Sequence, residues 1–129
     1  MNISELMTPN PISLLPDDPI LEKINIFEDN NIHHIPVVSD TGDIIGMISS
    51  TDVDNITSVM GTISEFNRSI LVKDVMTKPV FSFYEDVDIK QAARAMVDNN
   101  INAIVVVDKK ENIVGIITST DLLKYIAES

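Results

Sequence analysis

The chain has 129 residues, no cysteine, and 20 acidic against 9 basic side chains, which gives a formal net charge of -11. This length suits one compact domain or two small modules that share a core. The missing cysteines exclude a disulfide scaffold, a thiolate metal site and a cysteine nucleophile. The acidic balance argues against nucleic acid and anionic membranes as partners, because both are bound through Lys and Arg.

The first residues have neither the basic region nor the apolar segment of a secretory signal. The longest apolar run, Ala103–Val107, is too short to span a bilayer. We therefore expect a cytoplasmic protein. With two histidines in the whole chain, a catalytic triad or a His-rich metal site is poorly supplied.

The first predicted elements are a short extended segment at 12–14 and then an amphipathic helix. Asp18 is a suitable N-cap for this helix and Pro19 a suitable first residue. The helix runs into Asn-Asn-Ile, where an Asn can take the left-handed conformation that ends a helix. Strands at 35–38 and 44–48 then form a hairpin, and a second helix begins near Ser50 and extends through residue 63 across a weakening Gly61.

The same series of elements recurs 69 residues later. From Met7 to Asp52 the chain overlays residues 76–121 without a gap, and 18 of the 46 positions are identical, where about 3 would coincide by chance. The second copy has its extended segment at 80–83, its hairpin strands at 103–107 and 113–117, and its last helix from Ser119. We divide the chain into a first repeat (1–56), a connecting segment (57–71) and a second repeat (72–129).

The sharpest local pattern also occurs twice, as Gly46-Met-Ile-Ser-Ser-Thr-Asp52 and as Gly115-Ile-Ile-Thr-Ser-Thr-Asp121. In each copy a strand ends in a hydroxyl residue, and an Asp follows in the first turn of a helix. One interpretation is simple helix capping. The other is that the helix start faces a ligand, with the Asp carboxylate accepting hydrogen bonds from a ribose diol. The residues alone leave both open.

Together these features resemble a tandem pair of cystathionine-β-synthase (CBS) domains, also called a Bateman module. The resemblance covers residues 3–126 and rests on the Met-Thr starts, the Ile35-Pro36-Val-Val strand and the duplicated Gly-to-Asp motif. It implies an α/β fold of two β-α-β-β-α repeats packed about a pseudo-twofold axis through their sheets. It also implies adenosyl ligands such as AMP, ADP, ATP or S-adenosylmethionine in two clefts, with the motif Asp on the ribose. Val105 departs from the pattern, because Pro36 is the matching residue of the first copy.

By this analogy each cleft combines a motif with segments from elsewhere in the chain. One cleft takes Thr118 and Asp121 with Thr8, Pro11, Ile12, Ile32, His33 and His34. The other takes Ser49 and Asp52 with Thr77, Lys78, Val80, Phe81, Ile101, Asn102 and Ala103. As side chains that contact the phosphate group of a ligand, however, His33 and His34 are expected at the phosphate end of the Ser49–Asp52 cleft. The alternative for this His pair is a surface or core-rim position, and for Lys78 a solvated loop position.

The charge is unevenly divided along the chain. Residues 1–67 hold 11 acids and one base, and residues 68–129 hold 9 acids and 8 bases. Phosphate-rich ligands are therefore repelled near the first repeat unless histidines, bases or a metal ion intervene. We expect no cofactor and no metal site, with Mg²⁺ entering only together with a phosphate-rich ligand.

The resulting hypothesis is a non-catalytic regulatory module that binds an adenosyl nucleotide and transmits the ligand state to a separate effector protein. The alternative is a ligand-free interaction or dimerisation scaffold. An enzyme is disfavoured because neither a Walker loop nor a positioned general base is present in the sequence. A homodimer is expected, with the apolar faces Val53-Ile56-Met60 and Leu122-Ile126 at its interface.

Overall fold

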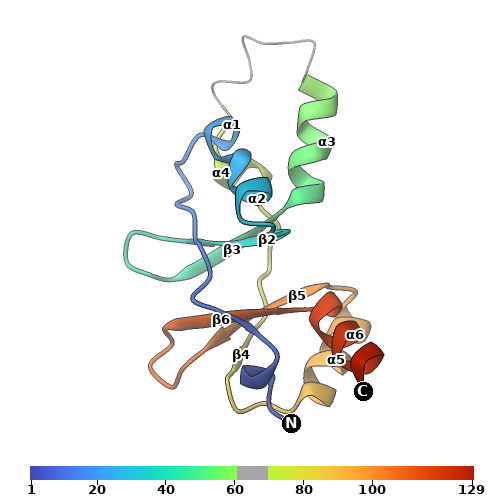
Figure 1. Cartoon of the computed structure of the whole chain (residues 1–129). Coiled ribbons are helices and arrows are strands. Elements are labelled where there is room, and N and C mark those ends of the chain that lie inside the picture. The colour runs from blue at the N-terminus through green and yellow to red at the C-terminus, as the bar shows by residue number, and fades with distance from the viewer. Residues whose placement is uncertain (61–69) are drawn as a thin grey trace. The chain divides into compact units, whose positions relative to one another are not determined.

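The computed structural model of the chain describes residues 1–60 and 70–129, and leaves the side chains of residues 57, 59 and 60 undescribed (Figure 1). The chain forms two compact units, each described here by itself. Unit 1 consists of residues 1–11 and 81–129, and unit 2 of residues 12–80. Both contain strands and helices, which confirms the α/β class. Residues 61 and 63, placed in the second predicted helix, lie outside the described part.

Unit 1 is built on a four-stranded sheet with the order β1-β6-β5-β4 (Figure 1). Its strands are β1 (Thr8–Pro9), β4 (Ser82–Tyr84), β5 (Ala103–Val107) and β6 (Ile113–Thr118). Strand β6 is antiparallel to both of its neighbours, and β4 is parallel to β5. Helices α5 (Ile89–Asn99) and α6 (Ser119–Glu128) and the 3-10 turn η1 (Ile3–Glu5) contribute to the unit's core, in which Ala92 and Met96 of α5 pack against Ile104, Val106 and Ile117.

Unit 2 is built around the hairpin of β2 (His34–Val38) and β3 (Ile44–Ser49). Its helices are α1 (Ile20–Lys23), α2 (Asn25–Asp29), α3 (Ser50–Met60) and α4 (Val72–Val75). Two isolated bridges flank the hairpin, Leu14 with Val37 and Met47 with Thr77. Adding 69 to the numbers of Leu14, Val37 and Met47, and subtracting 69 from that of Thr77, gives the β4–β5 pair Phe83 and Val106 and the β1–β6 pair Ile116 and Thr8. The two units therefore share one strand register.

Both predicted hairpins are confirmed, each extended by one residue where the second strand meets its helix, and the first also by His34 at its start. The predicted left-handed Asn residues are confirmed as well. Asn31 and Asn100, 69 positions apart, have φ values of 52° and 51°. The conformation is one that Asn tolerates better than most residues. It turns the chain so that Ile32 and Ile101 return to the cores of their units.

The first predicted helix differs from expectation at its start. Helix α1 begins at Ile20 with Pro19 as its N-cap, and Asp18 instead accepts a hydrogen bond from Leu15 N–H at 2.9 Å. Asp18 lies one residue too early to cap, and its carboxylate closes a turn before the helix. The helix is also divided at Ile24, where Phe27 N–H donates to the carbonyl of Ile24, three residues back rather than four. Helix α5, capped by the side chain of Asp88, is continuous.

The predicted strand at 12–14 is reduced to the single bridge at Leu14, whereas its counterpart β4 is a true strand. Val105 N–H donates to Phe81 O at 3.0 Å and extends the pairing of β4. The equivalent of Val105 in unit 2 is Pro36, which has no N–H. The carbonyl of Ile12 therefore lacks this backbone donor, and the strand is shorter.

The stretch that precedes the first strand of each repeat, residues 1–11 or 70–80, is called its lead segment below. Each lead segment belongs to the unit that contains the other repeat's hairpin. Thr8 pairs with Ile116, and Thr77 exchanges two backbone hydrogen bonds with Met47 at 2.8 and 3.1 Å. The units are thus not the same as the repeats, because the two repeats have exchanged their lead segments.

A methionine of each lead segment fills the space above a motif glycine. A Cβ added to Gly115 would overlap Met7 Sδ, and one added to Gly46 would overlap Met76 Sδ. Glycine is needed here because a neighbouring side chain occupies the space of a Cβ. The packing of these methionines therefore accounts for the glycine of each motif without a ligand.

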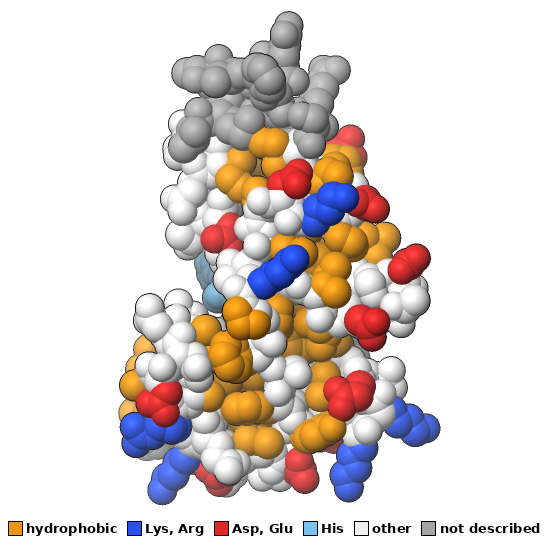
Figure 2. All heavy atoms as spheres, turned by 180° about the vertical axis from the view of Figure 1, so that it is seen from behind, with side chains coloured by type: hydrophobic (Ala, Val, Ile, Leu, Met, Phe, Trp, Pro, Cys, Tyr) orange, Lys and Arg blue, Asp and Glu red, His pale blue; other side chains and the backbone are white. Residues whose placement is uncertain are grey.

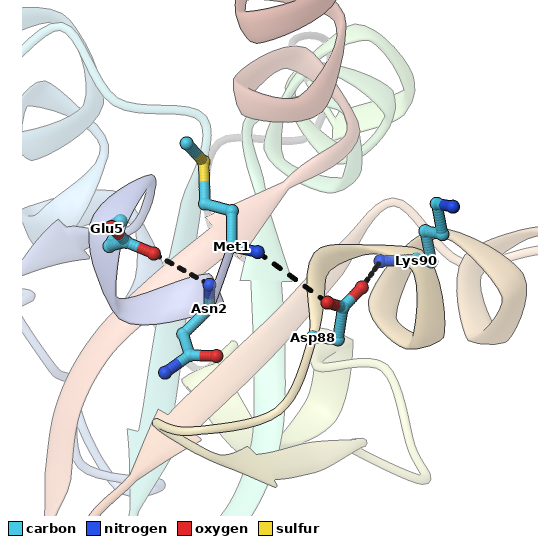
Figure 3. Close-up of polar contacts among 5 residues, drawn as sticks. All are labelled: Met1, Asn2, Glu5, Asp88 and Lys90. Carbon is cyan, nitrogen blue, oxygen red and sulfur yellow. Dashed lines mark hydrogen bonds and ion pairs between the residues drawn. The ribbon is translucent and has the colours of Figure 1, made fainter.

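The chain start is fixed on unit 1 by hydrogen bonds and one ion pair (Figure 3). Ile89 N–H donates to Met1 O at 3.0 Å, and the Met1 ammonium lies 3.6 Å from Asp88 Oδ2. Lys90 N–H donates to Asp88 Oδ1 at 2.8 Å. This backbone hydrogen bond is the largest influence on the Asp88 carboxyl. With help from the nearby ammonium it lowers the pKa below its ordinary value, against a smaller opposing effect of burial.

Candidate functional site

The Asp121 group of unit 1 lies where β6 ends and α6 begins. Thr118 N–H donates to Asp121 Oδ2 at 2.8 Å, and Asp121 N–H donates to Thr118 Oγ1 at 3.3 Å. This reciprocal pair is a capping box, which satisfies N–H groups that have no partner within the helix. Both side chains are half-buried. The capping interpretation of the motif is therefore correct for this copy.

The Asp52 group of unit 2 has the same geometry. Ser49 N–H donates to Asp52 Oδ2 at 3.0 Å, and Asp52 N–H donates to Ser49 Oγ at 3.1 Å. The exchanged lead segment adds a third group, because Thr77 Oγ1 lies 3.5 Å from Asp52 Oδ2. The motif thus holds its own helix start and also meets the lead segment of the other repeat.

Capping and ligand binding are compatible in this arrangement. The capping bonds of Asp52 and Asp121 all use Oδ2. Among residues 1–60 and 70–129, no hydrogen bond is found to Oδ1 of either carboxylate. A carboxylate oxygen has two acceptor positions. Each motif therefore offers a fixed acceptor, oriented by the cap, to a hydroxyl group from outside.

The starts of β2 and β5 lie beside the motif of their own repeat. His34 pairs with Ser49, and Ala103 pairs with Thr118. Likewise Ser50 N–H donates to His33 O at 2.8 Å, and Ser119 N–H to Asn102 O at 2.9 Å. Within its own unit, each motif therefore has the start of its own repeat's hairpin beside it. The two cleft assignments, and the placement of His33 and His34 at the phosphate end of one cleft, stay predictions.

The His33 side chain meets the start of helix α3, where its Nδ1 lies 3.2 Å from Ser50 Oγ. In unit 1 the corresponding residues are Asn102 and Ser119, and no side-chain bond joins them among the described residues. The imidazole of His33 is exposed, and that of His34 is half-buried. The two motif groups are therefore equal in backbone geometry and unequal in the groups that surround them.

The remaining predicted site residues divide between the units. Lys78 is exposed and Thr8 lies on strand β1 opposite Ile116. Those in unit 2 are Ile12, Ile32, Lys78 and Val80, and those in unit 1 are Thr8, Pro11, Phe81, Ile101, Asn102 and Ala103.

Unit 1 has one feature that sequence analysis did not single out. A pocket of about 380 Å³ extends along α6 from Asp121 and is lined by Leu6, Asp121, Lys124, Tyr125, Glu128 and Ser129. Positions 121, 124, 125 and 128 follow the spacing of one helix face, and this spacing is the signal that could have identified them. At the matching positions of α3 the chain has Asn55, Ile56 and Val59.

The net charge differs less between the two units than between the two halves of the sequence. Unit 2 has 11 acids and 4 bases, a net charge of -7, and unit 1 has 9 acids and 5 bases, a net charge of -4. Figure 2 shows acidic and basic side chains interspersed on the visible surface. No group of three or more His, Asp or Glu side chains suited to a metal ion is found in the described part of the chain.

The predicted apolar interface requires one correction. Val53 is 3% exposed and belongs to the core of unit 2, so it cannot contribute to an outer face, and the side chain of residue 60 lies outside the description. On α6 the exposed apolar residues are Leu123 and Ile126, at 64% and 66%, while Leu122 packs against the core. Among the described helices, none combines the length and apolar character needed to cross a membrane.

Comparison with known proteins agrees with the duplicated architecture. The family model for the CBS domain matches the chain twice, at residues 3–56 and 72–128. The chain therefore belongs to the CBS domain family. It is similar to the crystal structure of the CBS domain pair of protein MJ0100 in complex with 5'-methylthioadenosine and S-adenosyl-L-methionine, with a TM-score of 0.82 and 26% identity, covering 99% of this chain and 97% of that one.

Two relatives from Methanocaldococcus jannaschii illustrate different settings of the same pair. The uncharacterized protein MJ1426 is 31% identical over 152 residues, which cover 96% of this chain and 90% of that protein. Inosine-5'-monophosphate dehydrogenase is 34% identical over 120 residues, which cover 93% of this chain but 22% of the enzyme. The chain thus spans less than a quarter of that enzyme's length.

Proposed function

We propose that the protein is a regulatory module that binds an adenosyl compound at the Asp52 and Asp121 groups and transmits the ligand state to another protein. The observation that carries this proposal is the repeated capping box. In both copies the helix start fixes one oxygen of a half-buried carboxylate and leaves the other oxygen without a bond within the described residues. Such a pre-oriented acceptor suits a ribose diol.

Family membership supports the same ligand class. The CBS domain pair of MJ0100, 26% identical over nearly the full chain, is in complex with two adenosyl compounds. The proposal is non-catalytic, because binding to one of two conformations is sufficient to shift their populations. It requires no cofactor, and Mg²⁺ would accompany only a phosphate-rich ligand. Action in the cytoplasm, as a homodimer with Leu123 and Ile126 of α6 in the interface, is part of the proposal.

The test is calorimetry of the purified chain with 5'-methylthioadenosine, S-adenosylmethionine, AMP, ADP, ATP and GMP. We expect binding of at least one adenosyl compound in a roughly micromolar range, with GMP weaker. Asp52→Asn and Asp121→Asn should each weaken one class of site by about 10- to 150-fold, since a hydrogen bond to a charged acceptor is worth about 1.5–3 kcal/mol.

Asp98→Asn is the matched control. Asp98 is an exposed carboxylate on α5, so this variant loses the same charge without touching either motif. Asn is also a good capping residue, so Asp52→Asn and Asp121→Asn should remain folded, which circular dichroism checks. If no adenosyl compound bound, or if the double variant bound as tightly as the parent, the motifs would be helix caps only. The ligand-free scaffold would then be the better description.

A further inference from the structure

The pocket along α6 contains several polar groups that the fold itself does not use. Asp121 Oδ1, Lys124 Nζ, Tyr125 Oη and the Glu128 carboxylate make no hydrogen bond or ion pair with the residues that the structure describes. Asp121 and Tyr125 are half-buried, and Lys124 and Glu128 are exposed at the rim. Four uncommitted polar side chains of both signs therefore converge on one cavity.

The order of the two rim charges favours their availability. Lys124 precedes Glu128 by four residues, and this order gives the weaker of the two possible helix ion pairs. No ion pair within 4.0 Å joins them in the described residues. Lys124 is thus free to pair with an anionic group from outside, and Glu128 is free to pair with a cationic one.

The chemistry of the lining constrains what can lie beside the ribose at Asp121. A pocket of about 380 Å³ lies in the size range of small-molecule sites. Its side chains supply two carboxylates and one ammonium, so a polyphosphate would encounter more repulsion than attraction. A zwitterionic tail can place its carboxylate on Lys124 and its ammonium group near Glu128 and the Tyr125 ring.

We propose that Lys124, Tyr125 and Glu128 form a tail subsite that makes the Asp121 group selective for adenosyl compounds with an amino-acid tail over nucleoside polyphosphates. This inference rests on the proposed function, because it assumes that Asp121 holds the ribose. It also distinguishes the two groups of the chain. The matching positions Asn55, Ile56 and Val59 carry no charge, so the Asp52 group lacks such a subsite.

The experiment isolates this subsite in the Asp52→Asn variant of the full chain. Calorimetry compares S-adenosylmethionine and S-adenosylhomocysteine, which share the amino-acid tail, with 5'-methylthioadenosine, which has none, and with ATP. We expect both tailed compounds to bind at least about tenfold more tightly than 5'-methylthioadenosine, and ATP to bind more weakly than either.

Adding Lys124→Gln should reduce the affinity of the two tailed compounds to that of 5'-methylthioadenosine, whose own affinity should stay unchanged. The control is Lys109→Gln, an exposed lysine in the β5–β6 turn, which should alter none of the affinities. Lys124 is exposed, so its variant should fold, and thermal melting of the free protein checks this.

Failure of this inference can be told apart from failure of the proposed function. If 5'-methylthioadenosine binds but ATP binds as tightly as the tailed compounds, the subsite is absent and the adenosyl function stands. The same conclusion follows if Lys124→Gln weakens all ligands equally. If neither the Asp52→Asn variant nor the parent chain binds any adenosyl compound, both proposals are wrong.

Discussion

Units 1 and 2 have the same strand register, yet two of their corresponding elements differ. Strand β4 of unit 1 corresponds to a single bridge at Leu14 in unit 2, and the continuous helix α5 corresponds to the divided pair α1 and α2. The bridges of unit 2 reproduce the pairings of β4 with β5 and of β1 with β6. One missing N–H, at Pro36, coincides with the shortened strand of unit 2. The register therefore follows from the hydrophobic pattern that the repeats share, while single residues decide how far each element extends.

The largest effect that would test this equivalence is expected at the motif glycines. Gly115→Ala should lower the free energy of unfolding by about 2–3 kcal/mol, and Gly46→Ala by about 1–2 kcal/mol, since overpacking costs about 1–3 kcal/mol. At Gly115 the three atoms nearest to the added Cβ include the backbone carbonyl oxygen of Thr8 at 3.0 Å, whereas at Gly46 all three belong to the side chain of Met76. A side chain can move aside more easily than a paired backbone.

Urea denaturation followed by circular dichroism measures both glycine variants. The double variant Gly115→Ala/Met7→Ala is the control, because removing the methionine side chain should recover part of the loss. Equal costs at the two glycines, or a larger cost at Gly46, would contradict the proposed role of the Thr8 carbonyl.

The next effect concerns the N–H that distinguishes Val105 from Pro36. Val105→Pro should cost about 1–2 kcal/mol of unfolding free energy, because the Phe81 carbonyl loses its backbone donor. In the reverse variant, Pro36→Val, the new amide should be protected from hydrogen exchange by the Ile12 carbonyl. Rapid exchange of that amide would mean that something other than the missing N–H shortens the strand at Leu14.

A smaller effect is expected where the motif groups differ in their neighbours. His33→Asn gives unit 2 the residue that unit 1 has at this place, Asn102. In the Asp121→Asn background, AMP binding should weaken by about three- to tenfold, because the contact of His33 with Ser50 holds the imidazole beside the motif. Calorimetry with adenosine provides the control, since a ligand without phosphate should bind equally to both proteins.

The smallest effect is a pH dependence confined to unit 1. The pKa of Asp88 is lowered in the folded chain, first by the hydrogen bond from Lys90 N–H. Its stabilising contribution is complete above the ordinary carboxyl pKa of about 3.9 and is lost as the pH falls through the lower folded value. Asp88→Asn keeps a capping oxygen but cannot titrate, so its melting temperature should depend less on pH below about 4.

Asp86→Asn controls for the loss of one negative charge in the same loop. Asp86 is exposed, and this variant should follow the acid dependence of the parent chain. If Asp88→Asn also followed the parent, the hydrogen bond from Lys90 would have no measurable influence on stability.

Local features of the molecule were predictable where one short segment carries the signal. The hairpins, the left-handed Asn31 and Asn100 and the helix starts at Ser50 and Ser119 are all encoded within a few neighbouring residues. The error at Asp18 arose because a turn and a cap both favour Asp. The repeat offset would have corrected it, since position 19 matches Asp88, which caps α5.

The exchange of lead segments could not be predicted from periodicity. Met7 and Met76 belong to the same pattern, and Gly46 and Gly115 offer the same space. Local sequence therefore does not decide which methionine packs on which glycine. The resemblance to the family indicated that Thr8 belongs with Asp121 and Thr77 with Asp52. The pocket residues Lys124 and Glu128 were missed because charged residues on a terminal helix are ordinarily solvated.

The exchanged lead segments also determine the order in which the units can form during synthesis. All residues of unit 2 have been made once the chain reaches residue 80, whereas β1 must wait for its partner β6, more than a hundred residues later. At ordinary translation rates this delay is on the order of ten seconds. Residues 1–4 meet their backbone partners in 85–89 earlier, but until β6 is made Thr8 and Pro9 have no strand partner and Met7 has no Gly115 to pack on. A nascent chain stalled before residue 113 would therefore expose this part of the lead segment to chaperones and proteases.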